Sequence, residues 1–183
     1  MDFNKMMKAY EVANAEVDPD WETEVIINSL KVNNSQEAIF IEESTEFLTE
    51  LELAETGVYD NIDYTKPGIS NEGIMYICEE LVDIVIAASM ISHKYNISNE
   101  KKATNYIKTI SDIRYNLYEG IKATTKKLRL KTGCKHYVNE MTITFQYIAE
   151  IVVFTKKHYN ITDEMFNKMM NVKLARIETW YKK

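Results

Sequence analysis

The sequence contains few residues that interrupt or cross-link a chain. Among 183 residues there are 5 Gly, 2 Pro and two cysteines, Cys78 and Cys134. So few helix breakers favour long helices over an architecture of strands and tight turns. The cysteines form neither a disulfide framework nor a close CxxC metal pair. Because Cys78 lies in an apolar run, we expect it to be a small core residue.

Acidic residues outnumber basic residues in this chain. The chain has 22 Lys and Arg against 28 Asp and Glu, which gives a formal net charge of −6. A protein that binds nucleic acid by covering its phosphates needs a basic surface, so this composition argues against a nucleic-acid partner. A small phosphorylated ligand is still compatible with it, because a bound metal ion reverses the local field at one site.

The N-terminal sequence MDFNKMMKAYEV contains acids and has no uninterrupted apolar stretch, so it does not resemble a secretory signal. We therefore expect a cytoplasmic protein whose Asn-x-Ser/Thr triplets at Asn33, Asn96 and Asn160 carry no glycans. Hydrophobic residues make up 45% of the chain and charged residues 27%. That composition, at this length, predicts one globular domain over residues 1–183.

Helical periodicity or a capping signal marks seven segments: 2–15, 21–30, about 35–55, 74–94, about 98–127, 141–159 and the stretch after Thr162. The expected N-caps are Asn34 or Ser35, Ser98 and Thr162. We expect a long loop over 57–73 and a basic turn over 127–139. The sequence therefore predicts an all-α fold.

Two short segments of the chain resemble each other. HKYNISNE at 93–100 and KHYNITDE at 157–164 are offset by 64 residues, and each follows an apolar helix and opens a new one. This predicts a duplicated helix-turn-helix unit, with copies over about 35–100 and 101–183. The alternative is that short Tyr-Asn-Ile turns arise by chance.

The segment 74–94 is unusually apolar. From Ile74 to Ile91, only Glu79, Glu80, Asp83 and Ser89 are not apolar. A helix that is apolar all round is a buried one. Its length approaches that of a membrane span. Three acids at its centre would be costly in lipid, so we expect a core helix and no membrane partner.

Glu80 and Asp83 are three residues apart, which places them on one face of this helix. Ionised carboxylates in apolar surroundings are costly unless they are paired or bind a metal. The helix carries no Lys or Arg before Lys94, so the compensating charge has to come from elsewhere. In the second copy of the expected repeat, Thr144 and Tyr147 stand at these two positions.

Glu43 and Glu46 have the same spacing on the preceding helix. Two helices joined by one loop pack antiparallel by default, which brings the two acid pairs face to face. Four converging carboxylates do not all stay ionised without cations, and ligands that are all oxygen suit Mg²⁺ or Mn²⁺ better than Zn²⁺. A di-iron site would need Glu-x-x-His, which no acid here provides. The alternative for the first pair is an ordinary solvated acidic face.

EESTE at 42–46 followed by EELVD at 79–83 resembles the EExxE…ExxD signature of the MazG-like all-α NTP pyrophosphohydrolases. That superfamily includes dimeric dUTPases, dCTPases and phosphoribosyl-ATP pyrophosphohydrolases. The final segment, with Lys173 and Arg176 after Asn171, is similar to the segment that closes the family's fold. The resemblance covers about 35–99 and 159–180. The long gap between the acid motifs and the additional stretch over 101–137 suggest a duplicated or elaborated form, similar to the dimeric dUTPases.

The resemblance implies a bundle of helices, assembled as a homodimer or larger, that hydrolyses a nucleoside triphosphate to the monophosphate and pyrophosphate with Mg²⁺, or Mn²⁺, as cofactor. It leaves the base and sugar open. It implies metal ligands at Glu43, Glu46, Glu80 and Asp83, catalytic roles for Glu46 and Glu80, and phosphate contacts from Lys173 and Arg176.

The sequence leaves some assignments open. The alternative function is a catalytically inactive helical module that binds a nucleotide or a protein. The basic segment from Lys122 to Lys135 either steers an anionic substrate or is a solvated helix end and turn. Candidate base contacts, each with a structural role as the alternative, are Trp21, Asn34, Gln36 and Tyr76.

Overall fold

A computed structural model of the chain describes residues 36–60, 68–97, 106–130 and 134–181, with the side chains of 134 and 178–181 left aside. Its elements are α3 (Gln36–Glu55), α4 (Asn71–Tyr95), α5 (Ile110–Leu130), α6 (Cys134–His158) and α7 (Asp163–Tyr181). An isolated bridge joins Asp60 and Ile69. The predicted all-α fold is confirmed for these residues. The helices expected over 2–15 and 21–30, and the caps Asn34, Ser35 and Ser98, lie outside them.

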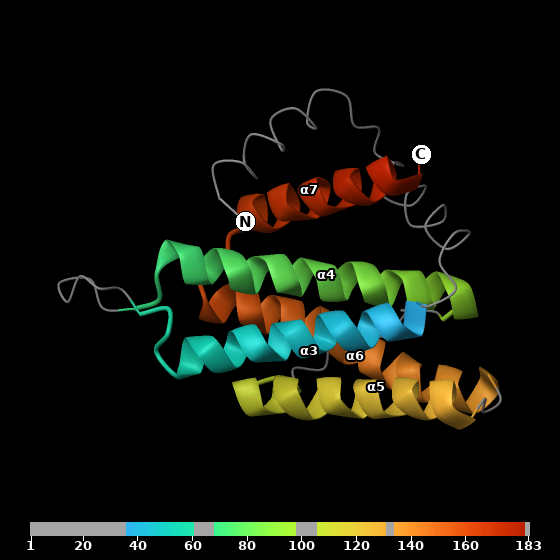
Figure 1. Cartoon of the computed structure of the whole chain (residues 1–183). Helices are drawn as coiled ribbons and strands as arrows, with labels where there is room; N and C mark the ends of the chain where they lie inside the picture. Colours follow the sequence, from blue (N-terminus) through green and yellow to red (C-terminus); the bar gives the residue numbers. More distant parts are fainter. Residues whose placement is uncertain (1–35, 61–67, 98–105, 131–133, 182–183) are drawn as a thin grey trace.

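The helices form two antiparallel pairs (Figure 1). α3 packs along α4, and α5 packs along α6. The pairs join because α3 also contacts α5, and α4 contacts α6. α7 packs on α4, on the side of the α3–α4 pair away from α5 (Figure 1). The antiparallel packing expected for the two acid-bearing helices is therefore present.

The centre of the core is α4, as its apolar sequence predicts. Ile77, Cys78, Leu81 and Ile84 are fully buried there, so the small-core role expected for Cys78 is confirmed. α4 begins at Asn71, slightly earlier than expected, because the Ser70 side chain caps it by accepting a hydrogen bond from a backbone N–H in the first turn. No helix in the described part of the chain is long and apolar enough to cross a membrane.

α5 begins at Ile110, later than the sequence predicts. Thr109 caps it: its hydroxyl accepts the Asp112 N–H, and the Asp112 carboxylate accepts the Thr109 N–H in return. Just before this cap, the backbone N–H groups of residues 106 and 107 donate to the buried carboxylate of Glu150 on α6. These side chains satisfy backbone donors that an earlier helix start would have satisfied internally.

The basic turn expected over 127–139 is wrong in extent. α5 continues to Leu130 and α6 already begins at Cys134. Lys, Leu and Arg are good helix formers, so basic composition alone does not end α5. Tyr137, in the first turns of α6, is 1% exposed and packs edge-on against Tyr95 of α4. This packing stabilises a stretch of α6 for which the sequence predicted a turn.

The two similar segments adopt the same turn. Asn96 and Asn160 have positive φ angles of 51° and 56°. In each, the next residue, Ile97 or Ile161, is buried and donates its N–H to the carbonyl five positions earlier. This is the Schellman ending of a helix, in which Asn tolerates the left-handed conformation. Duplication of a whole unit stays a prediction. Thr162 caps α7 as expected, accepting the N–H of residue 165.

Candidate functional site

Three of the predicted site residues meet between α3 and α4. Carboxylate oxygens of Glu43, Glu46 and Glu80 all lie within 4.8 Å of one another. Glu43 and Glu80 are half-buried, and Glu46 is exposed. The cluster therefore has a closed side inside the bundle and an open side at Glu46.

The apolar residues of the two helices fix these positions. On α3, Phe40, Phe47 and Leu51 are fully buried, which leaves the glutamates at the border of the core. On α4, Leu81 and Ile84 are fully buried and directly follow the acid positions 80 and 83. Because both helices are held by large core side chains, the carboxylates are brought together by packing and not by attraction between them.

Burial and mutual repulsion perturb these acids. Burial, and then the charges of Asp83 and Glu46, raise the pKa of Glu43 to about 7. Burial, and then the neighbouring carboxylates, raise the pKa of Glu80 to about 8. One oxygen of Glu80, Oε2, is buried and has no hydrogen-bond partner among the described residues. A buried carboxylate oxygen without a partner is costly, so this corner of the site lacks a positive group or donor.

Lys173 of α7 supplies a positive charge beside the cluster. Its ammonium lies 2.7 Å from Oε1 of Glu79 and also bonds the Asp83 carboxylate. Its side chain is only 11% exposed. Burial alone would lower the pKa of Lys173, but the two carboxylates outweigh it and raise that pKa. Lys173 therefore stays charged, and it is the distant base that the acids of α4 require.

Asp83 lies at the site but outside the three-carboxylate cluster. Burial raises the pKa of Asp83, whereas the Lys173 ammonium opposes that rise. The structure thus places this predicted metal ligand in an ion pair. Arg176, one turn after Lys173 on α7, is exposed, and its charge also opposes the rise in the pKa of Asp83. Both predicted cations are therefore near the acids.

Glu79 was not among the predicted site residues. Its position four residues before Asp83 puts both on one helical face, which is the signal that could have included it. The structure shows that Glu79 and Asp83 share one lysine.

Two of the four candidate base contacts, Tyr76 and Gln36, lie in the described residues. Tyr76 donates its hydroxyl to Glu72 and its ring packs near that of Tyr59. Gln36 is buried at the start of α3. Trp21 and Asn34 lie outside the described residues.

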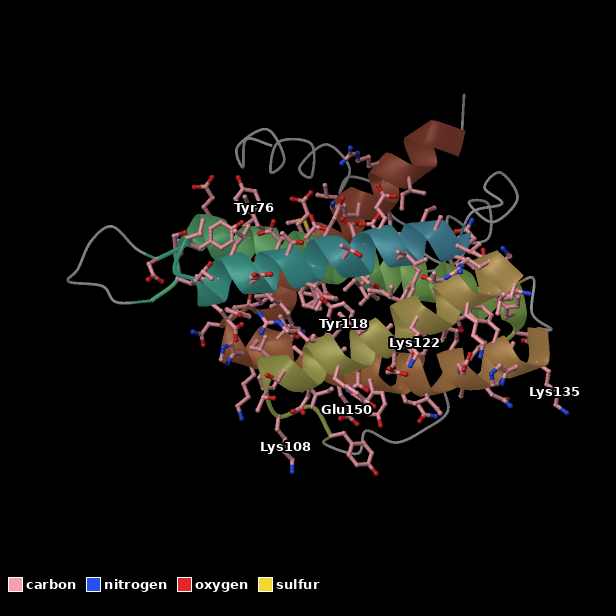
Figure 2. All side chains as sticks on the ribbon, turned by 60° about the horizontal axis from the view of Figure 1, so that its bottom comes forward. Tyr76, Lys108, Tyr118, Lys122, Lys135 and Glu150 are labelled. Carbon is pink, nitrogen blue, oxygen red and sulfur yellow. The ribbon has the colours of Figure 1, made fainter. Side chains whose placement is uncertain are left out.

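The basic segment lies away from the acids. Lys122 belongs to α5, and Lys135, at the start of α6, points away from the bundle (Figure 2). α5 is on the opposite side of the α3–α4 pair from α7, which carries Lys173 (Figure 1). The position of Lys122 and Lys135 favours the solvated helix end over substrate steering.

Glu43, Glu46 and Glu80 are the described residues that could hold a divalent cation, and Arg176 is an exposed cation near them. Comparison of the chain with protein-family models, with curated proteins and with solved structures finds no match.

Proposed function

We propose that this chain is a magnesium-dependent nucleoside triphosphate pyrophosphohydrolase with a MazG-like helical bundle. One observation carries the proposal. Glu43, Glu46 and Glu80 converge within 4.8 Å, and one Glu80 oxygen is buried without a hydrogen-bond partner in the described part of the chain. Lys173 lies next to them.

The donor set suits a hard cation. The three carboxylates offer only oxygen atoms, which favours Mg²⁺ or Mn²⁺ over metals that prefer nitrogen or sulfur. The raised pKa values of Glu43 and Glu80 show that the folded chain disfavours these negative charges when nothing compensates them. When bound, the ion would offset the triphosphate charge and lower the pKa of a water molecule at the site.

The reaction joins water to the α-phosphorus and breaks the bond between that phosphorus and the α–β bridging oxygen. The products are the nucleoside monophosphate and pyrophosphate. Glu46 is the exposed member of the cluster, so it is placed to orient the attacking water and accept its proton. In this proposal Arg176, which is exposed, contacts the phosphates and its charge favours the departing pyrophosphate. Lys173 adds positive charge beside them while it pairs with Glu79 and Asp83.

The test is release of pyrophosphate with Mg²⁺ from a panel of ribo- and deoxyribonucleoside triphosphates, with the products identified. We expect the monophosphate and pyrophosphate from at least one substrate. Glu46→Gln should reduce kcat by about 100-fold or more. Glu52→Gln, an exposed site on the same helix, is the matched control and should leave kcat unchanged.

Release of orthophosphate instead of pyrophosphate would contradict the proposed bond cleavage. Nucleotide binding without turnover of any substrate would instead favour an inactive binding module.

A further inference from the structure

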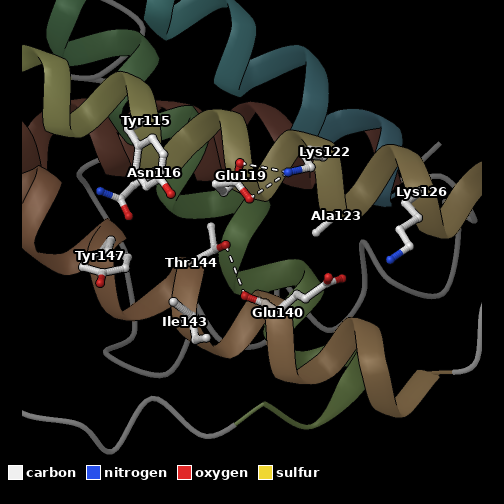
Figure 3. Close-up of a pocket in the computed structure, with 10 residues that line it drawn as sticks. All are labelled: Tyr115, Asn116, Glu119, Lys122, Ala123, Lys126, Glu140, Ile143, Thr144 and Tyr147. Atoms are coloured by element: carbon white, nitrogen blue, oxygen red, sulfur yellow. Dashed lines mark hydrogen bonds and ion pairs between the residues drawn. The ribbon is translucent and has the colours of Figure 1, made fainter.

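In the hollow between α5 and α6, each acid has a nitrogen partner of its own. Glu119 accepts hydrogen bonds from Lys122 (Figure 3), and the Glu140 carboxylate lies 3.2 Å from Nε2 of His136. Exposed pairs of this kind contribute little to stability. None of the buried side-chain polar atoms that lack a hydrogen-bond partner in the described part of the chain belongs to this hollow. The charges there are therefore already matched.

On the α7 side of α4 the matching is different, because two acids share one base. Nζ of Lys173 lies 2.7 Å from Oε1 of Glu79 and also bonds the Asp83 carboxylate. The side chains of Lys173, Glu79 and Asp83 are only 11%, 13% and 17% exposed. A buried lysine needs one carboxylate to balance its charge. Since Lys173 has two, one of these two acids is in excess.

Asp83 is the acid that also acts on the carboxylate cluster. Among the neighbouring charges, that of Asp83 contributes most to the raised pKa values of Glu43 and Glu80. The charge of Glu79 raises the pKa of Glu80 less than that of Asp83 does. Asp83 therefore interacts with both the cluster and Lys173, whereas Glu79 interacts mainly with Lys173.

A divalent cation held by the cluster would change the balance between these groups. It would attract the Asp83 carboxylate and repel the Lys173 ammonium. Lys173 is too buried to lose its compensating charge without a large cost in free energy. Glu79 can supply that charge by itself, because its own contact with Lys173 does not involve Asp83. Asp83 can then interact with the cation while Lys173 stays paired.

We propose that Glu79 is a positioning residue of the acidic site, which holds Lys173 so that the Asp83 carboxylate is available to the divalent cation. This inference rests on the metal site of the proposed function, and it adds a residue that the family resemblance does not assign. It explains how Asp83, a predicted metal ligand, bonds Lys173 in this structure without being lost to the metal.

The test is the affinity of the full chain for Mn²⁺, measured by electron paramagnetic resonance without nucleotide. Glu79→Gln should weaken binding by about 10-fold or more, because Lys173 then keeps Asp83 as its acid. Glu42→Gln is the matched control. Glu42 is exposed on α3, and its charge raises the pKa of Glu43 less than that of Asp83 does. It should weaken binding by about threefold at most, as removal of one nearby exposed charge does.

A second pair of variants shows whether Glu79 acts through Lys173. In a Lys173→Met background there is no ammonium to hold, so adding Glu79→Gln should weaken Mn²⁺ binding by about threefold at most. An Asp83→Asn background should give the same result, and it keeps Lys173 paired with Glu79 if the methionine variant does not fold. Circular dichroism checks the fold of each variant. Weakening by the same factor in the wild-type chain and in these backgrounds would overturn the proposal.

Failure of this inference can be told apart from failure of the proposed metal site. If the wild type binds Mn²⁺ and Glu80→Gln does not, but Glu79→Gln binds it as well as Glu42→Gln, only the role of Glu79 is wrong. If the wild type does not bind Mn²⁺, the metal site is wrong, and the role of Glu79 is wrong with it.

Discussion

Replacing Glu80 by Gln should change how stability depends on pH in the metal-free protein. Burial and neighbouring acids raise the pKa of Glu80 from 4.5 to about 8. Between those values the folded chain holds the proton, whereas the unfolded chain has released it. Because the folded state binds more protons, its free energy of unfolding falls as pH rises through this range. Gln has no proton to lose, so the variant lacks this part of the decline.

The magnitude follows from the size of the shift. One pKa unit corresponds to about 1.4 kcal/mol, so the rise from 4.5 to about 8 would be about 5 kcal/mol for a fully buried group. The Glu80 side chain is only half-buried, and water screens its repulsions. A discount of about one half or more leaves roughly 2 kcal/mol by about pH 8.

The assay is urea unfolding in chelator from about pH 5 to about pH 8. The variant should match the wild type near pH 5 and be more stable by about 2 kcal/mol near pH 8. Glu52→Gln, exposed on α3, should differ from the wild type by the same small amount at every pH. A Glu80 variant whose difference does not change with pH, or that is less stable near pH 8, would refute the reasoning.

Three further substitutions test the Asp83–Lys173 ion pair, the contact between α5 and α6, and one of the two Asn turns. Lys173→Met should lower the free energy of unfolding by about 3 kcal/mol, because it leaves Asp83, whose side chain is only 17% exposed, without its cation. Urea unfolding measures this change, and adding Asp83→Asn should recover part of it. Gly120→Ala should lower the free energy of unfolding by about 1–2 kcal/mol, because its clash with Thr144 outweighs the gain in helix propensity. Adding Thr144→Ala should remove the clash and restore stability. Asn160→Ala should lower stability by about 1 kcal/mol at its positive φ of 56°, whereas Asn160→Gly should not, as the two melting curves would show.

The central helices were predictable because local signals and packing agree there. The apolar run in α4 is long, and a run of this length with helical spacing is typical of a buried helix. The i, i+3 spacing of Glu43 and Glu46, together with one connection to α4, was enough to predict that they approach Glu80. No long-range information beyond antiparallel packing was needed.

The pairing of Asp83 with Lys173 could not be predicted in the same way. The two residues are 90 positions apart, and their contact depends on how α7 crosses α4. The family resemblance assigned one to a metal and the other to phosphate, whereas in the structure they bind each other. Sequence did show that the acids of α4 needed a base from elsewhere, but not which one.

Helix ends were the least predictable feature, for a physical reason. The start of α5 depends on Glu150, a residue of another helix that accepts backbone N–H groups before Ile110. The start of α6 depends on burial of Tyr137 against α4. Both helix ends depend on contacts with another helix, which local sequence propensity cannot predict. By contrast, the turns at Asn96 and Asn160 are local motifs. The similar sequences of the two segments were enough to predict that both adopt the same conformation.

The most direct test of the metal site is Mn²⁺ binding followed by electron paramagnetic resonance, without nucleotide. The wild type and Glu52→Gln should bind Mn²⁺ with the same affinity, and Glu80→Gln should lose that binding, because the proposed cation would lie among Glu43, Glu46 and Glu80. Equal binding by Glu80→Gln and the wild type, or no binding by either, would contradict a metal centre between α3 and α4.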